Sequence, residues 1–230
     1  MGPQVALIIP ALDEEETIGT TLDSLPSHAL AQVIVVDNGS ADRTAEIARA
    51  HGAQVVAELR RGYGQACLAG LAALAPEIDV VAFMDADGSD DPSDLARLLE
   101  PIARGQAQLV IGSRVLGVRE ADSLTPQQRF GNRLATYLLR LFYGARYTDL
   151  GPFRAIRRDA LERLGMRDTN FGWTVEMQVK ALRAGVRVKE VPVRCRRRRG
   201  GRSKVSGSLR GSLAAGAKIL WTILRFRFSG

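Results

Sequence analysis

Cysteines are scarce in this 230-residue chain, and long hydrophobic runs are missing. The two cysteines, Cys67 and Cys195, cannot build a disulfide framework, which favours a reducing compartment. No uncharged stretch reaches the ~18–20 residues of a membrane-spanning helix. The first apolar run, residues 5–9, is too short for a secretory signal, and acids follow it at once. We therefore expect a cytoplasmic protein whose length fits one domain, with or without an appendage.

Acidic residues are absent from the end of the chain. Residues 191–230 contain 11 lysines and arginines and no acid, whereas residues 1–190 contain 21 basic and 25 acidic residues. Such a basic stripe attracts phosphates on lipid head groups, on a ligand or on nucleic acid. Apolar residues, among them Trp221 and Leu224, predict a packed or membrane-facing helix over about residues 208–226. A solvated, partly disordered end is the alternative.

Segments typical of strands and of helices alternate over the first 112 residues. Strands are expected at residues 5–9, 33–36, 54–58, 80–84 and 109–111, and helices at residues 15–25, 41–50, 65–74 and 92–103. Ser40 and Asp91 occupy the positions of helix caps. This alternation predicts an α/β fold with a mostly parallel sheet flanked by helices.

The second half of the sequence is less regular. A helix over residues 125–143 has an apolar side with interspersed arginines, and it is either a core helix or an interfacial one. A turn into a strand is expected at residues 151–156, a helix at residues 173–184 and a strand at residues 186–193. We expect one domain over residues 1–193 and a basic, amphipathic C-terminal segment over residues 194–230.

Polar residues follow four of the predicted strands, where ligands bind in parallel sheets. Asp85 and Asp87 follow the fourth strand, and carboxylates at the end of a buried strand need compensation. A Mg²⁺ or Mn²⁺ ion that bridges to a diphosphate would compensate this negative charge. The alternative is that the two acids cap a helix or belong to an ordinary acidic loop. Asp37 after the second strand either accepts a hydrogen bond from a ribose or base, or forms an Asx turn. Residues 60–64 (RRGYG) precede a helix and form either an anion cradle or a solvated loop.

These stretches, in their order, resemble family 2 glycosyltransferases with the GT-A (Rossmann-like) fold. The matching stretches are residues 8–15 (IIPALDEE), residues 35–44 (VVDNGSADRT), residues 85–87 (DAD), which resemble the D-x-D metal motif, and residues 112–114 (GSR). The resemblance covers nearly the whole chain, and the dolichyl- and polyprenyl-phosphate sugar synthases are the most similar subgroup. It implies a nucleotide-sugar half over residues 1–114 and an acceptor half over residues 115–193.

The same resemblance assigns site residues. Asp85 and Asp87 would hold Mg²⁺ or Mn²⁺, with Asp87 as the direct ligand. Where the subgroup continues with Leu-Gln, this chain has Gly88 and Ser89, so the third ligand stays open among Ser89, Asp90 and water. The donor would be a UDP- or GDP-linked sugar. Its predicted binding residues are Pro10, Ala11, Leu12, Glu14, Asp37, Arg61, Asp85, Ala86, Arg114, Arg199, Arg202 and Lys204.

Residues 201–204 (GRSK) resemble the subgroup's G-E-S-K stretch, and Arg198 and Arg199 nearby could approach phosphates. The implied reaction is inverting transfer of a hexose from a nucleoside diphosphate sugar. A polyprenyl phosphate acceptor, dolichyl or undecaprenyl, needs no general base, whereas a hydroxyl acceptor would need Asp149 or Glu176. The basic tail favours the lipid phosphate, and implies a protein peripheral to the inner face of the cell membrane or held by a separate membrane partner. The candidate catalytic residues are Asp87, Asp149 and Glu176.

Three other functions compete with this prediction. A family 2 transferase acting on a sugar or small-molecule hydroxyl is the nearest alternative. A nucleotidyltransferase would usually carry a glycine-rich loop with a lysine after the first strand, where this chain has residues 10–14 (PALDE). A nucleic-acid-binding module could use the basic tail, but few aromatics interleave with its arginines and no reader motif is visible. We therefore predict no specific nucleic acid partner.

Overall fold

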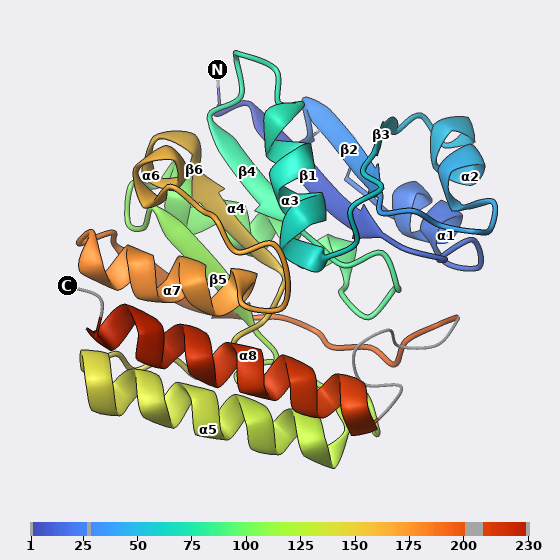
Figure 1. Ribbon diagram of the computed structural model, residues 1–230. Helices are drawn as coiled ribbons and strands as arrows, with labels where there is room; N and C mark the ends of the chain where they lie inside the picture. The colour runs from blue at the N-terminus through green and yellow to red at the C-terminus, as the bar shows by residue number, and fades with distance from the viewer. Residues whose placement is uncertain (1, 27–28, 201–208, 229–230) are drawn as a thin grey trace.

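Strands and helices of the computed structural model alternate through the first half of the chain, and helices dominate the second half (Figure 1). The structure describes residues 2–26, 29–200 and 209–228, without the side chains of residues 209–213. The strands are β1 (Val5–Ala11), β2 (Gln32–Asp37), β3 (Gln54–Ala57), β4 (Val80–Phe83), β5 (Leu109–Ser113), β6 (Arg154–Arg157) and β7 (Val188–Pro192). The helices are α1 (Ile18–Asp23), α2 (Thr44–Ala50), α3 (Tyr63–Ala72), η2 (Pro92–Asp94, a 3-10 helix), α4 (Leu95–Ala103), α5 (Pro126–Tyr143), α6 (Arg158–Leu164), α7 (Trp173–Arg183) and α8 (Leu209–Phe228).

A seven-stranded sheet with the order β3-β2-β1-β4-β6-β5-β7 forms the centre of the described chain. β1 pairs in parallel with β2 and β4, and β5 pairs in parallel with β7. β6 runs antiparallel to both of its neighbours, β4 and β5. The predicted α/β fold with a mostly parallel sheet flanked by helices is therefore confirmed. The carboxyl ends of the parallel strands meet at one edge, where ligands bind in sheets of this kind.

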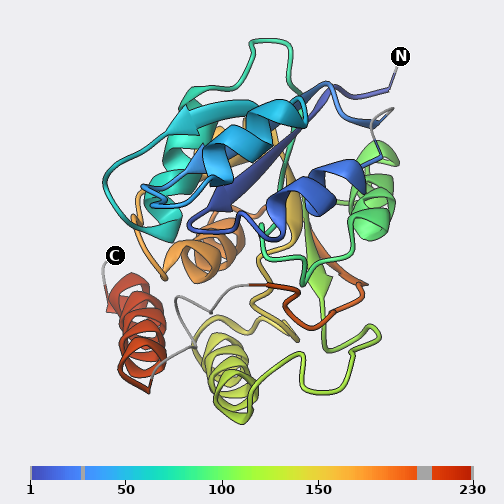
Figure 2. The ribbon, with the colours of Figure 1, turned by 90° about the vertical axis from the view of Figure 1, so that its right-hand side faces the viewer.

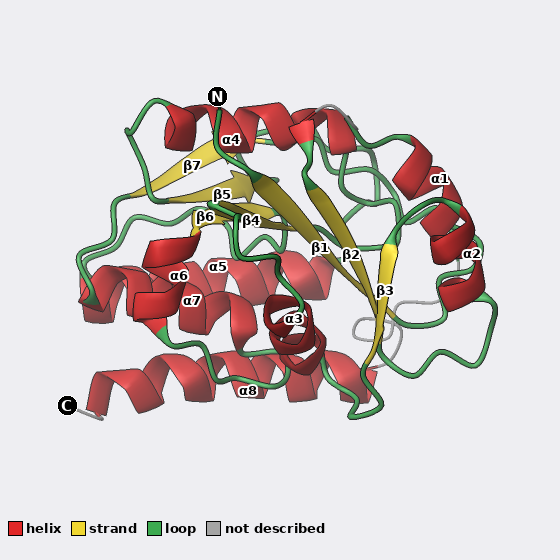
Figure 3. Ribbon diagram, turned by 90° about the horizontal axis from the view of Figure 1, so that it is seen from above, coloured by secondary structure: helices red, strands yellow, loops and turns green. Residues whose placement is uncertain are grey.

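Separate sets of helices cover the two faces of the sheet (Figure 3). Along β1 the side chains alternate, so that Leu7 and Ile9 enter one core while Ala6 and Ile8 enter the other. The first core includes residues of α1, α2 and α4, and the second includes residues of α3, α6 and α7. Because both faces are buried there, the strands β1, β4 and β5 are nearly continuous apolar runs rather than alternating ones.

Helices α5 and α8 lie side by side, next to α7 and away from the sheet (Figures 1 and 2). Ile223 of α8 is buried in a third apolar cluster with Leu139 of α5 and Val179 of α7. The Tyr143 hydroxyl donates a hydrogen bond to the Ile223 carbonyl at 2.7 Å. In the part of the chain that the structure describes, no helix combines the length and the apolar character needed to span a membrane. The division at residue 193 and the basic, amphipathic character of the whole C-terminal segment stay predictions.

One of the two predicted helix caps is confirmed and the other is wrong. The Asp91 carboxylate accepts a hydrogen bond from the Ser93 amide at 3.1 Å and caps η2, as predicted. α2 begins at Thr44, later than expected, and Ser40 does not cap it. The Ser40 hydroxyl instead accepts a hydrogen bond from the Asp13 amide at 3.0 Å, which holds the loop after β1.

Gly64 in the first turn of α3 provides a test of this packing, because a Cβ added there would lie 2.0 Å from the Asp168 carbonyl oxygen. We predict that Gly64→Ala lowers the free energy of unfolding by about 1–3 kcal/mol, the usual cost of overpacking. Urea denaturation measures the change. Gly131→Ala in α5 is the matched control, since a Cβ there meets nothing within 4 Å and should add up to ~1 kcal/mol. Equal losses in the two variants would contradict the packing argument.

Candidate active site

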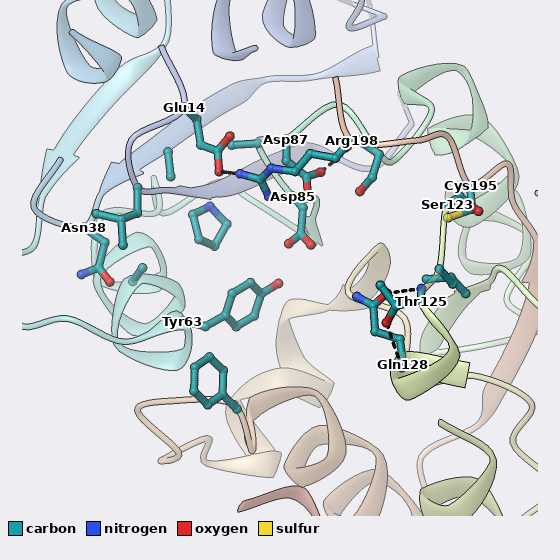
Figure 4. Close-up of a pocket in the computed structure, with 18 of the residues that line it drawn as sticks. Glu14, Asn38, Tyr63, Asp85, Asp87, Ser123, Thr125, Gln128, Cys195 and Arg198 are labelled. Carbon is teal, nitrogen blue, oxygen red and sulfur yellow. Dashed lines mark hydrogen bonds and ion pairs between the residues drawn. The ribbon is translucent and has the colours of Figure 1, made fainter. Parts of the chain in front are cut away.

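A cleft of about 850 Å³ opens where β1 and β4 end and α3 begins. Many of the predicted site residues line it, and Figure 4 shows Glu14, Asp85 and Asp87 together at its upper wall. The predicted residues in the wall are Pro10, Ala11, Leu12, Glu14, Arg61, Asp85, Ala86, Asp87, Ser89, Arg114 and Arg198. The fold therefore brings the loop after the first strand and the D-x-D stretch into a single site.

Other predicted site residues lie elsewhere. Arg202 and Lys204 fall outside the described residues. Asp37, Asp149, Glu176 and Arg199 are described, but they are not in the cleft wall. The wall also contains Asn38 and Tyr63, which belong to predicted stretches, and residues that the sequence analysis did not single out, among them Gln128, Asn170 and Phe171. Asn38 and Tyr63 lie within predicted stretches that follow strands, so their position was a usable signal, whereas the residues from distant segments offered none.

Asn38 holds the loop between β3 and α3 beside the cleft. Its Nδ2 donates to the carbonyls of Glu58 and Arg60 at 2.8 and 2.9 Å, and its Oδ1 accepts from the Gly62 amide at 2.8 Å. The preceding Asp37 carboxylate accepts from a backbone amide three residues later, at 3.0 Å. The bond spans one residue more than the Asx turn that the sequence left open as an alternative, but it ties Asp37 to the loop in a similar way. Asp37 therefore shapes the loop, while Asn38 reaches the cleft.

The segment leading into α2 fixes the loop after β1. The Glu14 amide donates to the Thr44 hydroxyl at 2.8 Å. Asp13, in the left-handed conformation with φ 50°, accepts from the Ala41 amide at 2.8 Å. The Glu14 carbonyl accepts from two amides of the following turn, so α1 begins later than predicted, at Ile18. These bonds place the Glu14 side chain in the cleft wall (Figure 4).

Three aspartates, Asp85, Asp87 and Asp90, crowd the end of β4. The Asp85 amide donates to the Asp90 carboxylate at 3.1 Å. Burial, followed by repulsion from Asp90 and Asp87, raises the pKa of Asp85 well above its usual value. Burial also raises the pKa of Asp90 to about 7. The cluster therefore resists full ionisation unless a further positive charge reaches it.

The chemistry of these carboxylates fits Mg²⁺ or Mn²⁺, because they are oxygen donors whose crowded negative charge a divalent cation would relieve. The Ser89 amide donates to Asp87 Oδ1 at 2.9 Å, which orients this carboxylate. Within the described ranges, no three or more His, Cys, Asp or Glu side chains are already grouped to hold a metal ion. A cation would therefore complete its coordination with oxygens of a bound ligand or of water, as Mg²⁺ usually does.

Arg198 reaches the cleft from the segment after β7. Its Nη1 lies 2.9 Å from Asp87 Oδ2, and its Nη2 bonds to the Glu14 carboxylate (Figure 4). Burial raises the pKa of Glu14, and the Arg198 guanidinium opposes this rise. The adjacent Arg199 amide donates to the Asp87 carbonyl at 3.2 Å. The protein itself thus supplies a positive charge to two acids of the cleft.

Asp149 is completely buried and pairs with Arg114 instead of facing the cleft. Nε and Nη2 of Arg114 each lie 2.8 Å from an oxygen of the Asp149 carboxylate, and the Arg114 amide donates to it at 2.8 Å. Burial alone would raise the pKa of Asp149, but the Arg114 guanidinium holds it below its usual value. The carboxylate therefore orients Arg114, whose side chain is 20% exposed and lines the cleft.

Glu176 in α7 is also buried, and its carboxylate holds the loop before α7. It accepts from the Asp168 amide at 2.7 Å and pairs with Lys180 Nζ at 2.7 Å. That loop meets the start of α3, where the Gln65 amide donates to the Thr169 carbonyl at 2.9 Å. Glu176 therefore supports the cleft wall from behind.

Comparison with known proteins places the whole chain among glycosyltransferases. The model of glycosyl transferase family 2 matches residues 6–165. An uncharacterised glycosyltransferase of Mycobacterium tuberculosis is 43% identical over 216 residues, which cover 93% of this chain and 95% of the relative. An undecaprenyl-phosphate mannosyltransferase of Micrococcus luteus is 32% identical over 244 residues, which cover 97% of this chain and 98% of the relative.

A solved structure shares the architecture. Glucosyl-3-phosphoglycerate synthase from Mycobacterium tuberculosis, crystallised with Mn²⁺, UDP and glucosyl-3-phosphoglycerate, has a TM-score of 0.81 at 25% identity, covering 98% of this chain and 80% of that one. The mostly parallel sheet, the acids after β4 and this similarity define a glycosyltransferase with the GT-A fold. The chain belongs to glycosyl transferase family 2, as its resemblance predicted.

Replacing Asp149 tests whether its carboxylate is structural. Asp149→Asn leaves Arg114 without its buried counter-charge, so we predict a loss of about 3–5 kcal/mol in the free energy of unfolding. Chemical denaturation at neutral pH measures the loss. Glu46→Gln, which breaks the exposed ion pair with Arg43, is the control and should leave the denaturation midpoint unchanged. Unchanged stability together with lost activity would instead identify Asp149 as a general base.

Proposed function

We propose that the protein transfers a hexose from a nucleoside diphosphate sugar to a polyprenyl phosphate, with inversion at the anomeric carbon. The observation that carries this proposal is the cleft wall, where Arg61, Arg114, Arg197 and Arg198 accompany the acids while neither predicted base is present. A phosphate acceptor is already ionised at neutral pH, so it needs cations to position it and no base. The mannosyltransferase of Micrococcus luteus, which is named for an undecaprenyl-phosphate acceptor, supports the same acceptor class.

The donor would occupy the cleft between the loop after β1 and the D-x-D stretch. Pro10, Leu12 and Asn38 offer apolar and polar contacts to a base and its ribose. Asp85 and Asp87 would hold Mg²⁺ or Mn²⁺ together with oxygens of the diphosphate. When bound, such a cation neutralises charge that develops on the leaving diphosphate. The Mn²⁺ and UDP in the crystallised synthase support this assignment.

The proposed reaction forms one bond and breaks one. An oxygen of the acceptor phosphate attacks the anomeric carbon, and the bond from that carbon to the diphosphate breaks on the opposite side. The electron pair leaves with the nucleoside diphosphate, and no proton has to move. Arg114, oriented by Asp149, and Arg198 would position the phosphates. The further phosphate-binding candidates, which stay predictions, are Arg199, Arg202 and Lys204.

The outer surfaces of α5 and α8 fit a membrane location for this activity. On α5, Phe130, Tyr137 and Leu141 are each at least 60% exposed, and their spacing places them along one side of the helix. On α8, Trp221 and Phe228 are exposed and seven residues apart. Both helices carry arginines and no acidic residue. We infer that this α5–α8 surface docks on the anionic inner leaflet of the cell membrane, which would present the polyprenyl phosphate.

A small phosphorylated acceptor is the second candidate. The similarity to glucosyl-3-phosphoglycerate synthase favours it. A hydroxyl on such an acceptor would need a general base to take its proton. Asp149 and Glu176 are committed to Arg114 and to the loop before α7, so this candidate ranks second.

A transfer assay identifies the acceptor. With Mn²⁺ or Mg²⁺ and a panel of radiolabelled UDP- and GDP-sugars, we expect a lipid-extractable product that depends on undecaprenyl or dolichyl phosphate. Asp87→Ala should lower kcat by ~100-fold or more, because charge on the leaving diphosphate loses its compensation. Asp23→Ala, which removes an exposed carboxylate in α1, should keep full activity. Transfer to 3-phosphoglycerate in place of the lipid would establish the second candidate, and no turnover with any donor would overturn the proposal.

Vesicle sedimentation tests the α5–α8 surface. The protein should bind vesicles of phosphatidylglycerol and phosphatidylcholine, and not vesicles of phosphatidylcholine alone. The double variant Phe130→Ser/Trp221→Ser should bind more weakly, because it loses apolar groups that insert between head groups. Leu59→Ser is the control, since Leu59 is 83% exposed on a different surface. Self-association without vesicle binding, detected by light scattering, would assign the surface to a dimer instead.

A further inference from the structure

Arg198 engages the carboxylate that is the best candidate for a metal ligand. Its guanidinium lies 2.9 Å from Asp87 and also bonds to Glu14, while its Nε donates to the Gly200 carbonyl at 2.8 Å. The Arg198 side chain is only 22% exposed, so the ion pair lies within the cleft wall. A cation bound to the same Asp87 oxygen would lie at short range from the guanidinium and would be repelled by its positive charge.

The backbone around Arg198 is held independently of its side chain. The Cys195 amide donates to the Val118 carbonyl at 2.9 Å, and the Arg196 amide donates to the Ser89 carbonyl at 2.8 Å. Arg198 itself bonds to Asp87 and Glu14 through its guanidinium and not through its backbone. A change of side-chain rotamer therefore suffices to release both acids, while the segment stays in place.

We propose that Arg198 is an internal counter-ion that competes with the divalent cation for Asp87 and is released when a nucleoside diphosphate binds. The inference rests on the proposed donor class. A cation that arrives alone has to displace the guanidinium, which leaves Glu14 and the freed arginine without their ionic partners. A cation that arrives with a diphosphate brings phosphate oxygens, and these accept the guanidinium in exchange for the carboxylates.

Cooperative binding of metal and nucleotide follows from this competition. If the nucleotide removes Arg198 from Asp87, it raises the affinity for the cation. By linkage, the cation raises the affinity for the nucleotide by the same factor. The donor site therefore binds a free divalent cation weakly, and it fills when the cation and the nucleotide are both present.

Manganese titrations without any acceptor test the proposal. Electron paramagnetic resonance measures free Mn²⁺ in titrations of the full chain, alone and with UDP or GDP. In the wild type, we expect one of the nucleotides to tighten Mn²⁺ binding by on the order of 10-fold. In Arg198→Gln, Mn²⁺ alone should bind on the order of 10-fold more tightly than in the wild type, and the effect of the nucleotide should shrink.

Two further variants separate competition from a general change in charge. Arg198→Lys keeps a cation beside Asp87, so Mn²⁺ alone should bind as weakly as to the wild type. Arg194→Gln removes the same charge from the same segment but outside the cleft wall, where Arg194 pairs with Asp91, and it should also leave Mn²⁺ binding unchanged. Thermal unfolding of each variant confirms that it is folded.

Equal affinity of the wild type and Arg198→Gln for Mn²⁺ alone would overturn the proposal. So would a similar gain in Arg194→Gln, because it would show that only net charge matters. If neither UDP nor GDP binds to the wild type, the proposed function fails instead. The comparison without nucleotide would still decide the role of Arg198, so the two failures are distinguishable.

Discussion

The convergence of acids at the edge of the sheet is the constraint on which the rest of the structure depends. β1 and β4 are parallel neighbours, so the residues that follow them, Glu14, Asp85 and Asp87, necessarily come together. Partly buried carboxylates at such short range need positive charge. The protein supplies it with arginines that arrive from its second half, above all Arg198. The ion pairs of Arg198 therefore join acids that are early in the sequence to a cation that is late in it.

Much of the fold was predictable because both faces of the sheet are buried. Continuous apolar runs bounded by polar residues marked β1 to β5, and their alternation with helices indicated parallel pairing. The direction of β6 was not predictable. Its four residues, Arg154–Arg157, do not encode an orientation, which is decided by antiparallel pairing with β4 and β5 on either side. The late start of α2 also escaped prediction, because the Ser40 hydroxyl bonds to a distant loop rather than to its own helix.

The candidate site was predictable only where charged or polar residues directly follow a predicted strand. Asp85 and Asp87 satisfied that rule, and they line the cleft. Asp149 and Glu176 did not, because an acid that faces a substrate and an acid that faces an internal arginine or amide look alike in sequence. The arginine run after β7 posed the same difficulty. Its composition indicated phosphates, but only the three-dimensional structure distinguishes Arg198 from the arginines beside it.

The bond between Glu14 and Arg198 joins residues 184 positions apart, so a growing chain exposes the acids long before their arginine is made. On the ribosome, β1 to β4 can pair before Arg198 has been made. Until then, the acids at the carboxyl ends of β1 and β4 lack the arginine that pairs with them, and this edge of the sheet repels negative charge. The loop after β4 also lacks its backbone partners at first, because the Ser89 and Asp87 carbonyls accept hydrogen bonds from the segment after β7, which is made later. Because such long-range contacts form slowly, the donor site is among the last parts of the molecule to take shape. A partly synthesised chain would therefore have most of its sheet and none of its function.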